Sequence, residues 1–167
     1  MPAFSGEKRV RGGVAGSVPV AVLDTSVLYG DSSRRELVAA IREGRFDGIW
    51  SPHIVAELNR ALTVRWVQQN GFGNASLRRL SRAAKDMMDV LLSTLQLVDA
   101  NPVDGEEPIL FDDIDDYHLI RAARLARATF VVSANTRDFP KRGRDGRRVL
   151  DGVEFIERVP FLSRIAR

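Results

Sequence analysis

The chain has 167 residues, 44% of them hydrophobic, which is the length and composition of a single globular domain with a sizeable core. It lacks the run of about 18 apolar residues that a membrane span needs, and its first residues lack the apolar centre of a secretory signal, so we expect a cytoplasmic protein. The absence of cysteine excludes disulfides, thiolate nucleophiles and cysteine zinc sites, and with only two histidines we expect any metal site to rest mainly on oxygen ligands.

The net charge of +3 is distributed unevenly along the chain. Residues 104–116 contain seven of the 22 acidic residues and none of the 25 basic ones. Basic residues around an acidic segment suit a protein that acts on a polyanion. The basic residues would bind the polyanion, and a cation held by the acids would take part in its reaction. However, 22 of the basic residues are arginine, and a coding bias toward arginine explains this composition as well as nucleic-acid binding does.

The first half of the chain predicts alternating strands and helices. Residues 1–17 are rich in glycine and basic residues and predict a flexible basic arm, whereas residues 18–167 predict a single domain. In chain order, the expected elements are a buried parallel strand at 18–24, a helix with a serine N-cap at 32–46, a short strand at 47–50, and a helix at 52–70 that Ser51 caps and Gly71 ends.

The second half continues this alternation, which is typical of an α/β sheet. The expected elements are a helix at 74–95, a strand at 96–100, an acid-rich helix at 112–127, a strand at 129–134, an edge strand or turn at 149–156, and a closing helix at 160–167. The outer face of helix 74–95 carries Arg78, Arg82 and Lys85 at helical spacing. Such a stripe is typical of a solvated face as well as of RNA contact.

Asp24 ends the first expected strand and is followed by two hydroxyl residues, Thr25 and Ser26. In parallel α/β sheets ligands bind just beyond the carboxyl ends of the strands, which makes Asp24 a candidate functional residue. Residues of these types are also typical of turns and helix caps, so the local pattern leaves both interpretations open.

Two further candidate acids come from helices. Counting 100° per residue places Asp116 on the inward stripe of Leu119 and Ile120, although a carboxylate bonded to backbone amides at a helix N-terminus is an alternative. Glu57 lies at the margin of the apolar face of its helix.

If these acids and Asp24 converge at one sheet edge, their repulsion requires a cation, and oxygen ligands favour Mg²⁺ or Mn²⁺. Such ions bind phosphate oxygens, which suggests phosphodiester hydrolysis.

Four segments resemble the PIN-domain ribonucleases, and most closely the VapC-type toxins of bacterial toxin-antitoxin pairs. They are "VLDTSVL", "SPHIVAEL", "DIDDYHLIRAA" and "TFVVSANTRDFP", which follow the family's order and spacing over about residues 18–140. The resemblance implies a PIN-like three-layer α/β fold with a central, mostly parallel sheet of four to five strands flanked by helices.

The resemblance also implies a set of acidic metal ligands for Mg²⁺ or Mn²⁺. By position in these motifs they are Asp24, Glu57 and Asp116. Asp116 is preferred to Asp115 because the family's acid directly precedes the stretch that resembles "YHLIRAA", and the helical count agrees.

Asn135 stands where the family often has a fourth acid. An amide oxygen still orients a water on a metal but adds no negative charge, so we expect a second ion to bind weakly. Asp138 either compensates for this difference or only shapes the turn. Thr25 and Ser133 are expected to donate supporting hydrogen bonds, and His118 is expected to be structural or at the surface.

The activity that the resemblance implies is metal-assisted hydrolysis of RNA by water, giving a 5′ phosphate and a 3′ hydroxyl. Arg78, Arg82 and Arg142 are candidates to hold the backbone of single-stranded or looped RNA. Expected partners are the RNA substrate, a second copy in a homodimer, and a small antitoxin protein that occludes the acidic site. Two other functions stay open: a PIN-like module that binds RNA or protein without cutting because of Asn135, and a small-phosphoester hydrolase.

Overall fold

The computed structural model describes residues 18–100 and 117–166 and contains one six-stranded sheet. Its strands are β1 (Val20–Leu23), β2 (Asp47–Trp50), β3 (Gln96–Leu97), β4 (Phe130–Val132), β5 (Val149–Leu150) and β6 (Val153–Ile156), in the order β3-β2-β1-β4-β6-β5. Every neighbouring pair is parallel except β5 and β6. The predicted α/β fold with a mostly parallel sheet is therefore confirmed, but the sheet has six strands and not the expected four to five, because the segment 149–156 forms both β5 and β6.

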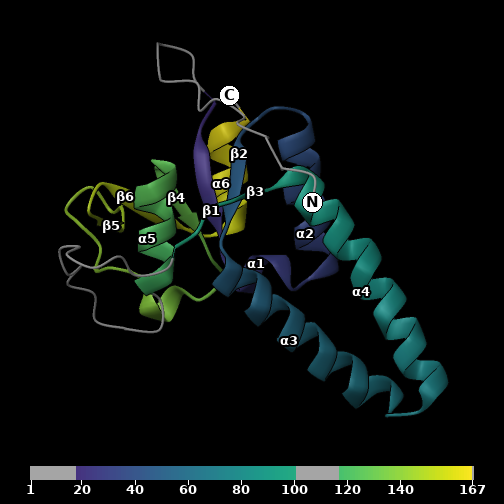
Figure 1. Cartoon of the computed structure of the whole chain (residues 1–167). Helices are drawn as coiled ribbons and strands as arrows, with labels where there is room; N and C mark the ends of the chain where they lie inside the picture. Colours follow the sequence, from purple (N-terminus) through teal and green to yellow (C-terminus); the bar gives the residue numbers. More distant parts are fainter. Residues whose placement is uncertain (1–17, 101–116, 167) are drawn as a thin grey trace.

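Helices flank this sheet (Figure 1). They are α1 (Thr25–Leu28), α2 (Asp31–Arg42), α3 (Pro52–Asn70), α4 (Asn74–Thr94), α5 (Tyr117–Ala126) and α6 (Arg158–Ile165). Helix α5 packs against β1, β2 and β4, where it buries Leu119 and Ile120. Helix α6 buries Phe161, whose ring contacts Phe46 and Phe130 with centroids 4.9 and 5.3 Å away. The central strands are thereby covered with apolar side chains, as β-branched parallel strands require.

Helices α3 and α4 form a long hairpin that projects from the sheet (Figure 1). The start of α3 follows the prediction: Ser51 is the N-cap and accepts a hydrogen bond from the amide of Ile54 (3.4 Å), and Pro52 is the first helical residue. Gly71 ends the helix with φ of +69°, a conformation that favours glycine. The cap fixes where α3 leaves the end of β2, and this positions the side chains of its first two turns.

Two segments differ from the sequence prediction. Helix α2 begins at Asp31 with Gly30 at the N-cap, not with a serine, because the preceding residues form the four-residue helix α1. Ser33 then donates to the carbonyl of Val27 (2.6 Å), which joins α2 to α1. The segment 149–156 is more than an edge strand or turn, since β5 is the edge and the fully buried β6 lies inside the sheet beside β4.

Some sequence predictions fall outside the described residues. These are the arm at 1–17 and the acidic segment at 104–116. Among the helices that the structure describes, none combines the length and the hydropathy of a membrane span.

Candidate active site

The residues that follow β1 and β4 lie side by side at the carboxyl edge of the sheet. The amide of Asp24 donates to the carbonyl of Val132 (3.0 Å), and the amide of Ser133 donates to the carbonyl of Ile156 at the end of β6 (3.1 Å). These bonds extend the sheet pairing by one residue beyond the strands. They bring Asp24 and Ser133 together although the two residues are far apart in the sequence.

The carboxylate of Asp24 is the centre of a hydrogen-bonded cluster. Its Oδ2 accepts hydrogen bonds from the hydroxyls of Ser26 (2.5 Å) and Ser133 (2.8 Å). Backbone amides hold the two hydroxyls in turn, since Ala134 donates to Ser26 Oγ (2.9 Å) and Asn135 donates to Ser133 Oγ (3.0 Å). Asp24 is only 8% exposed, so the cluster fixes a buried carboxylate.

This geometry bears on the capping interpretation of Asp24. The residue occupies the N-cap position of α1, but its side chain makes no capping hydrogen bond within the described residues. Its carboxylate is held by Ser26 and Ser133 instead. The cap interpretation therefore does not explain why an acid stands here.

Glu57 is the second predicted acid at this edge. It lies in the second turn of α3 and is half-buried. Its Oε2 accepts a hydrogen bond from Oγ1 of Thr25 (2.8 Å), the buried residue that directly follows Asp24. Each of these two acids thus accepts a hydrogen bond from one of the hydroxyls that the sequence analysis proposed, Thr25 for Glu57 and Ser133 for Asp24.

Positive side chains do not neutralise these carboxylates in the described part of the chain. Across residues 18–100 and 117–166, no lysine or arginine forms an ion pair with Asp24 or Glu57. A buried carboxylate is costly unless it is hydrogen-bonded and paired or bound to a metal. Two carboxylates with only hydroxyl donors fit a hard divalent cation, which prefers oxygen ligands.

The other predicted site residues are placed only in part. Asp115 and Asp116 lie outside the described residues. Asn135 directly follows this cluster and is exposed, and the backbone of Asp138 lies in the 3₁₀ turn Thr136–Asp138. The first turn of α5 lies beside the first turn of α3, because the ring of His118 stacks on that of His53.

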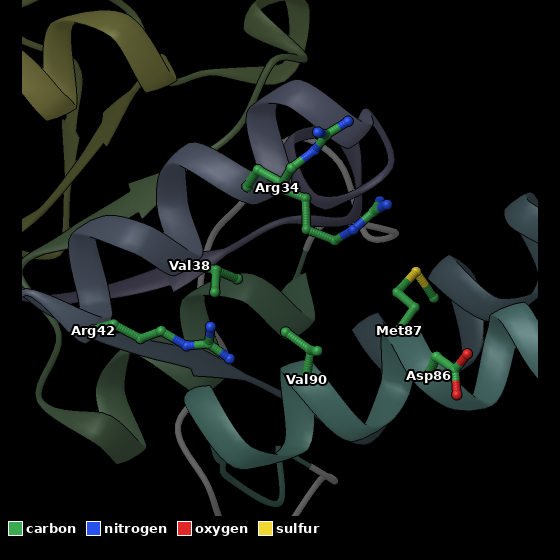
Figure 2. A pocket seen from close by; sticks show the side chains of 7 residues that line it. Arg34, Val38, Arg42, Asp86, Met87 and Val90 are labelled. Carbon is green, nitrogen blue, oxygen red and sulfur yellow. The ribbon is translucent and has the colours of Figure 1, made fainter.

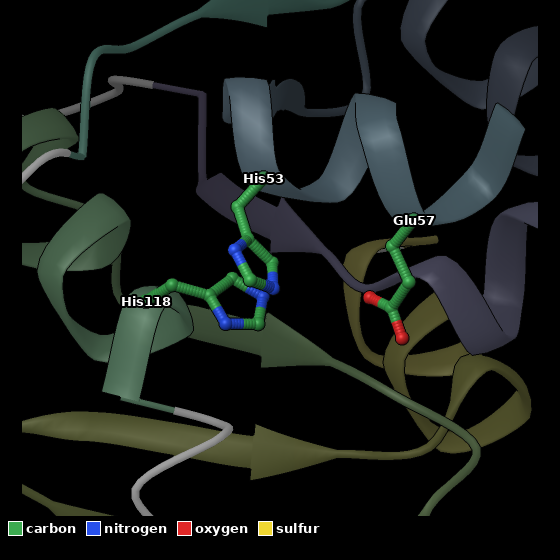
Figure 3. A group of neighbouring side chains, drawn as sticks. All are labelled: His53, Glu57 and His118. Carbon is green, nitrogen blue, oxygen red and sulfur yellow. The ribbon is translucent and has the colours of Figure 1, made fainter. Parts of the chain in front are cut away.

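The sequence analysis missed one group of residues at this edge. His53, Glu57 and His118 each offer a ligand atom, and these atoms all lie within 4.8 Å of one another (Figure 3). His118 is half-buried and stacks on His53 at this edge, so its expected structural or surface role stays a prediction. In the sequence, the only indication of this group is the spacing of His53 and Glu57, which places the two side chains one turn apart on the same face of a helix.

The predicted RNA-binding arginines lie elsewhere on the molecule. Arg78 and Arg82 are exposed on α4, and Arg142 is exposed in the loop before β5, where it donates to the carbonyl of Gly146 (2.8 Å). Within the described residues they form no hydrogen bond or ion pair with Asp24 or Glu57.

A separate pocket of about 360 Å³ opens between α2 and α4 (Figure 2). Three arginines stand among its lining side chains, which are Arg34, Arg35, Val38, Arg42, Asp86, Met87 and Val90. None of the predicted site residues lines it. The pocket is therefore a feature distinct from the acidic cluster.

Comparison with known proteins agrees with this geometry. A family model described as the PIN domain matches residues 20–137. The chain belongs to the PIN domain family, whose members are generally nucleases that use divalent metals. No curated protein matches the chain. The fold is similar to the crystal structure of PAE2754 from Pyrobaculum aerophilum, with a TM-score of 0.56 and 16% identity over 90% of each chain, a likeness that concerns the fold alone.

Proposed function

We propose that this protein is a ribonuclease that depends on Mg²⁺ or Mn²⁺. One observation carries the proposal: Asp24 and Glu57 lie at the carboxyl edge of a PIN-domain sheet, where Glu57 accepts a hydrogen bond from the residue after Asp24. No lysine or arginine of the described residues forms an ion pair with either carboxylate. Their uncompensated charge supports the binding of a divalent cation. In a family of nucleases, such a cation serves the hydrolysis of a phosphodiester.

The proposed roles combine the positions in the family motifs with the contacts of the described side chains. Asp24 and Glu57 hold the ion together with Asp116, and Asn135 orients water or substrate. Ser26 and Ser133 fix the Asp24 carboxylate through Oδ2, as ligand carboxylates commonly require. When bound, a divalent ion lowers the pKa of a coordinated water and stabilises the charge that develops on the phosphate.

The proposed substrate is single-stranded or looped RNA, whose bases splay out more readily than those of a duplex. Exposed arginines support RNA binding, because Arg78 and Arg82 on α4 and Arg142 before β5 lie at the surface, where a phosphate backbone can contact them. We expect each arginine-to-glutamine variant at these positions to weaken RNA binding and to reduce its salt dependence.

The test of the nuclease proposal is RNA cleavage by the purified chain with added Mn²⁺ or Mg²⁺. Asp24→Asn, Glu57→Gln and Asp116→Asn are expected to lose cleavage while their circular dichroism stays that of the wild type. The matched controls are Asp89→Asn and Glu43→Gln, which alter acids in exposed ion pairs and should cleave normally.

Two other outcomes of this experiment would indicate the alternative functions. RNA binding without cleavage under every metal would replace the nuclease with a non-cutting PIN module, in which Asn135 disables the site. Turnover of a small phosphoester but not of RNA would indicate a small-phosphoester hydrolase.

We further propose that the protein is the toxin of a toxin-antitoxin pair and acts in the cytoplasm. The test is growth arrest on induced expression, relieved by Asp24→Asn or by the product of an adjacent reading frame. Normal growth of cells that contain active enzyme would instead favour a housekeeping ribonuclease.

A homodimer is the proposed assembly. Apolar side chains are exposed along the α3–α4 hairpin, which is unusual for a surface that faces only water. They include Val64 (51% exposed), Phe72 (77%) and Leu77 (37%). Sedimentation velocity is expected to show a dimer that Phe72→Asp and Leu77→Asp weaken, whereas a monomer at all concentrations would contradict this assembly.

A further inference from the structure

Two histidines and a glutamate from separate helices converge beside the acidic cluster. His53 and Glu57 lie one turn apart on α3, so their side chains share a face. His118 comes from the first turn of α5, and all three point into the same space between the two helices (Figure 3). Their ligand atoms lie within 4.8 Å of one another.

The surrounding structure positions all three ligands. Ser51 and Pro52 fix the start of α3, and the buried residues Leu119 and Ile120 anchor the first turn of α5. The two imidazole rings stack with centroids 4.0 Å apart and planes inclined by 28°. Each ring therefore limits the rotation of the other.

Glu57 is oriented by a hydrogen bond, as ligand carboxylates usually are. Thr25 donates to its Oε2, which leaves Oε1 available to an ion. No lysine or arginine of the described residues forms an ion pair with this carboxylate. The group thus combines two nitrogen donors with one negative oxygen donor.

The separation of the donors suits a metal ion. Ligand nitrogen and oxygen atoms lie about 2.0 to 2.2 Å from a transition metal, so donors on opposite sides of one ion are about 4 Å apart. An imidazole lone pair lies in the plane of its ring, so a shared ion requires the exposed His53 to turn out of its stack on His118. The exposure of His53 also gives an ion access from solvent.

We propose that His53, Glu57 and His118 form a binding site for a divalent transition-metal ion. Imidazole with carboxylate is a donor set for ions from Mn²⁺ to Zn²⁺, whereas Mg²⁺ takes oxygen ligands. Three protein ligands leave one position open for water or a phosphate oxygen. The site shares Glu57 with the proposed nuclease centre, but the binding of the ion does not depend on cleavage.

The test uses the metal-free full-length protein titrated with Co²⁺, whose visible absorption reports nitrogen ligation. We expect a histidine-dependent Co²⁺ spectrum, and we expect Zn²⁺ to displace this Co²⁺ more readily than Mg²⁺ does. His53→Phe keeps an aromatic ring to stack on His118 but removes the ligand atom, and it should weaken Co²⁺ binding at least 10-fold. His118→Phe is the reciprocal variant. Arg60→Gln, exposed one turn beyond the site on α3, is the control and should bind as the wild type does.

A second readout exploits the histidine content. Because the chain has only two histidines, the imidazole region of a ¹⁵N-correlated NMR spectrum contains the signals of these two rings alone. Stoichiometric Co²⁺ should shift or broaden both sets of signals. Unchanged imidazole signals, or unchanged Co²⁺ affinity in folded His53→Phe, would overturn the proposal.

The two proposals fail separately. Histidine-dependent Co²⁺ binding by a chain that cleaves no RNA would contradict only the nuclease. RNA cleavage by a wild type whose Co²⁺ affinity is unaffected by either phenylalanine variant would contradict only this metal site.

Discussion

Thr25 donates a hydrogen bond of 2.8 Å through Oγ1 to Oε2 of Glu57. The two residues belong to α1 and α3, which follow the neighbouring parallel strands β1 and β2. Because Thr25 is also the residue after Asp24, this single bond sets the relative position of the two predicted metal-binding carboxylates. The bond thus connects the segment that follows β1 to a candidate metal ligand on α3.

Replacing Thr25 with valine tests this link. Valine has nearly the same shape but no donor, so Glu57 should lose its fixed orientation. We expect metal-dependent RNA cleavage to fall about 10- to 100-fold, the usual cost of losing a partner of a metal ligand. The measurement is kcat/KM as a function of Mn²⁺ concentration. Thr63→Val removes an exposed hydroxyl that bonds only the carbonyl of Asn59 on the same helix, and equal losses in both variants would contradict the prediction.

Ser133→Ala tests the anchoring of Asp24. The substitution removes one of the two hydroxyl donors to Oδ2 and leaves the amide of Asn135 without its acceptor. Hydrogen bonds to charged groups contribute about 1.5 to 3 kcal/mol, so we expect a loss of that order in the free energy of unfolding. Urea denaturation of the metal-free protein measures it. Ser163→Ala, whose hydroxyl is exposed on α6, should change stability by less than about 0.5 kcal/mol.

Local signals in the sequence predicted the elements that position the site. Ser51, Pro52 and Gly71 mark both ends of α3 by their own backbone preferences, and the structure has the helix between them. The β-branched strand before Asp24 likewise predicted a central parallel strand. Such features depend on neighbouring residues, so a single sequence contains the information.

Contacts between distant elements were not accessible in this way. The stacking of His53 on His118 depends on how α5 packs against the sheet beside α3, and no pattern within either helix encodes it. The burial of β6 was missed for a similar reason. A glutamate within a strand usually indicates an exposed edge. Glu154 is buried inside the sheet because Arg147 and Arg164 compensate its charge, and only the folded chain brings these arginines to it.

Glu154 gives a prediction about pH. Its side chain is only 5% exposed and accepts hydrogen bonds from Arg147 (2.8 and 2.5 Å) and Arg164 (2.6 Å). Burial alone raises the pKa of this carboxyl, but the hydrogen bonds and charges of the two arginines outweigh it and lower the pKa. A pKa that is lower in the folded than in the unfolded state means that the ionised group stabilises the fold.

The sign of this effect fixes the expected pH profile. The stabilisation is fully present above the unfolded pKa of a glutamate, about 4.3, and is lost as the pH falls through the lower folded pKa. Glu154→Gln should therefore be less stable than the wild type at neutral pH, by about 1 to 3 kcal/mol, and the difference should shrink in acid. Urea denaturation at several pH values measures it, with the exposed Glu157→Gln as control. A difference that is constant with pH would contradict the assignment.

Side chains from the end of α2 and from the residue after α4 lie directly against Gly48 in β2. A Cβ at this residue would lie 2.5 Å from both Cδ1 of Ile41 and Cδ2 of Leu95, so Gly48→Ala must displace two side chains in the core. Overpacking of this kind costs about 1 to 3 kcal/mol. Because Ile41→Val removes the Cδ1 atom, the double variant should recover part of the loss, and thermal and urea unfolding will measure the coupling. Gly73→Ser, which adds its Cβ in open space at the N-cap of α4, should cause no loss. Strictly additive effects of Gly48→Ala and Ile41→Val would show that Ile41 is not the side chain that must move.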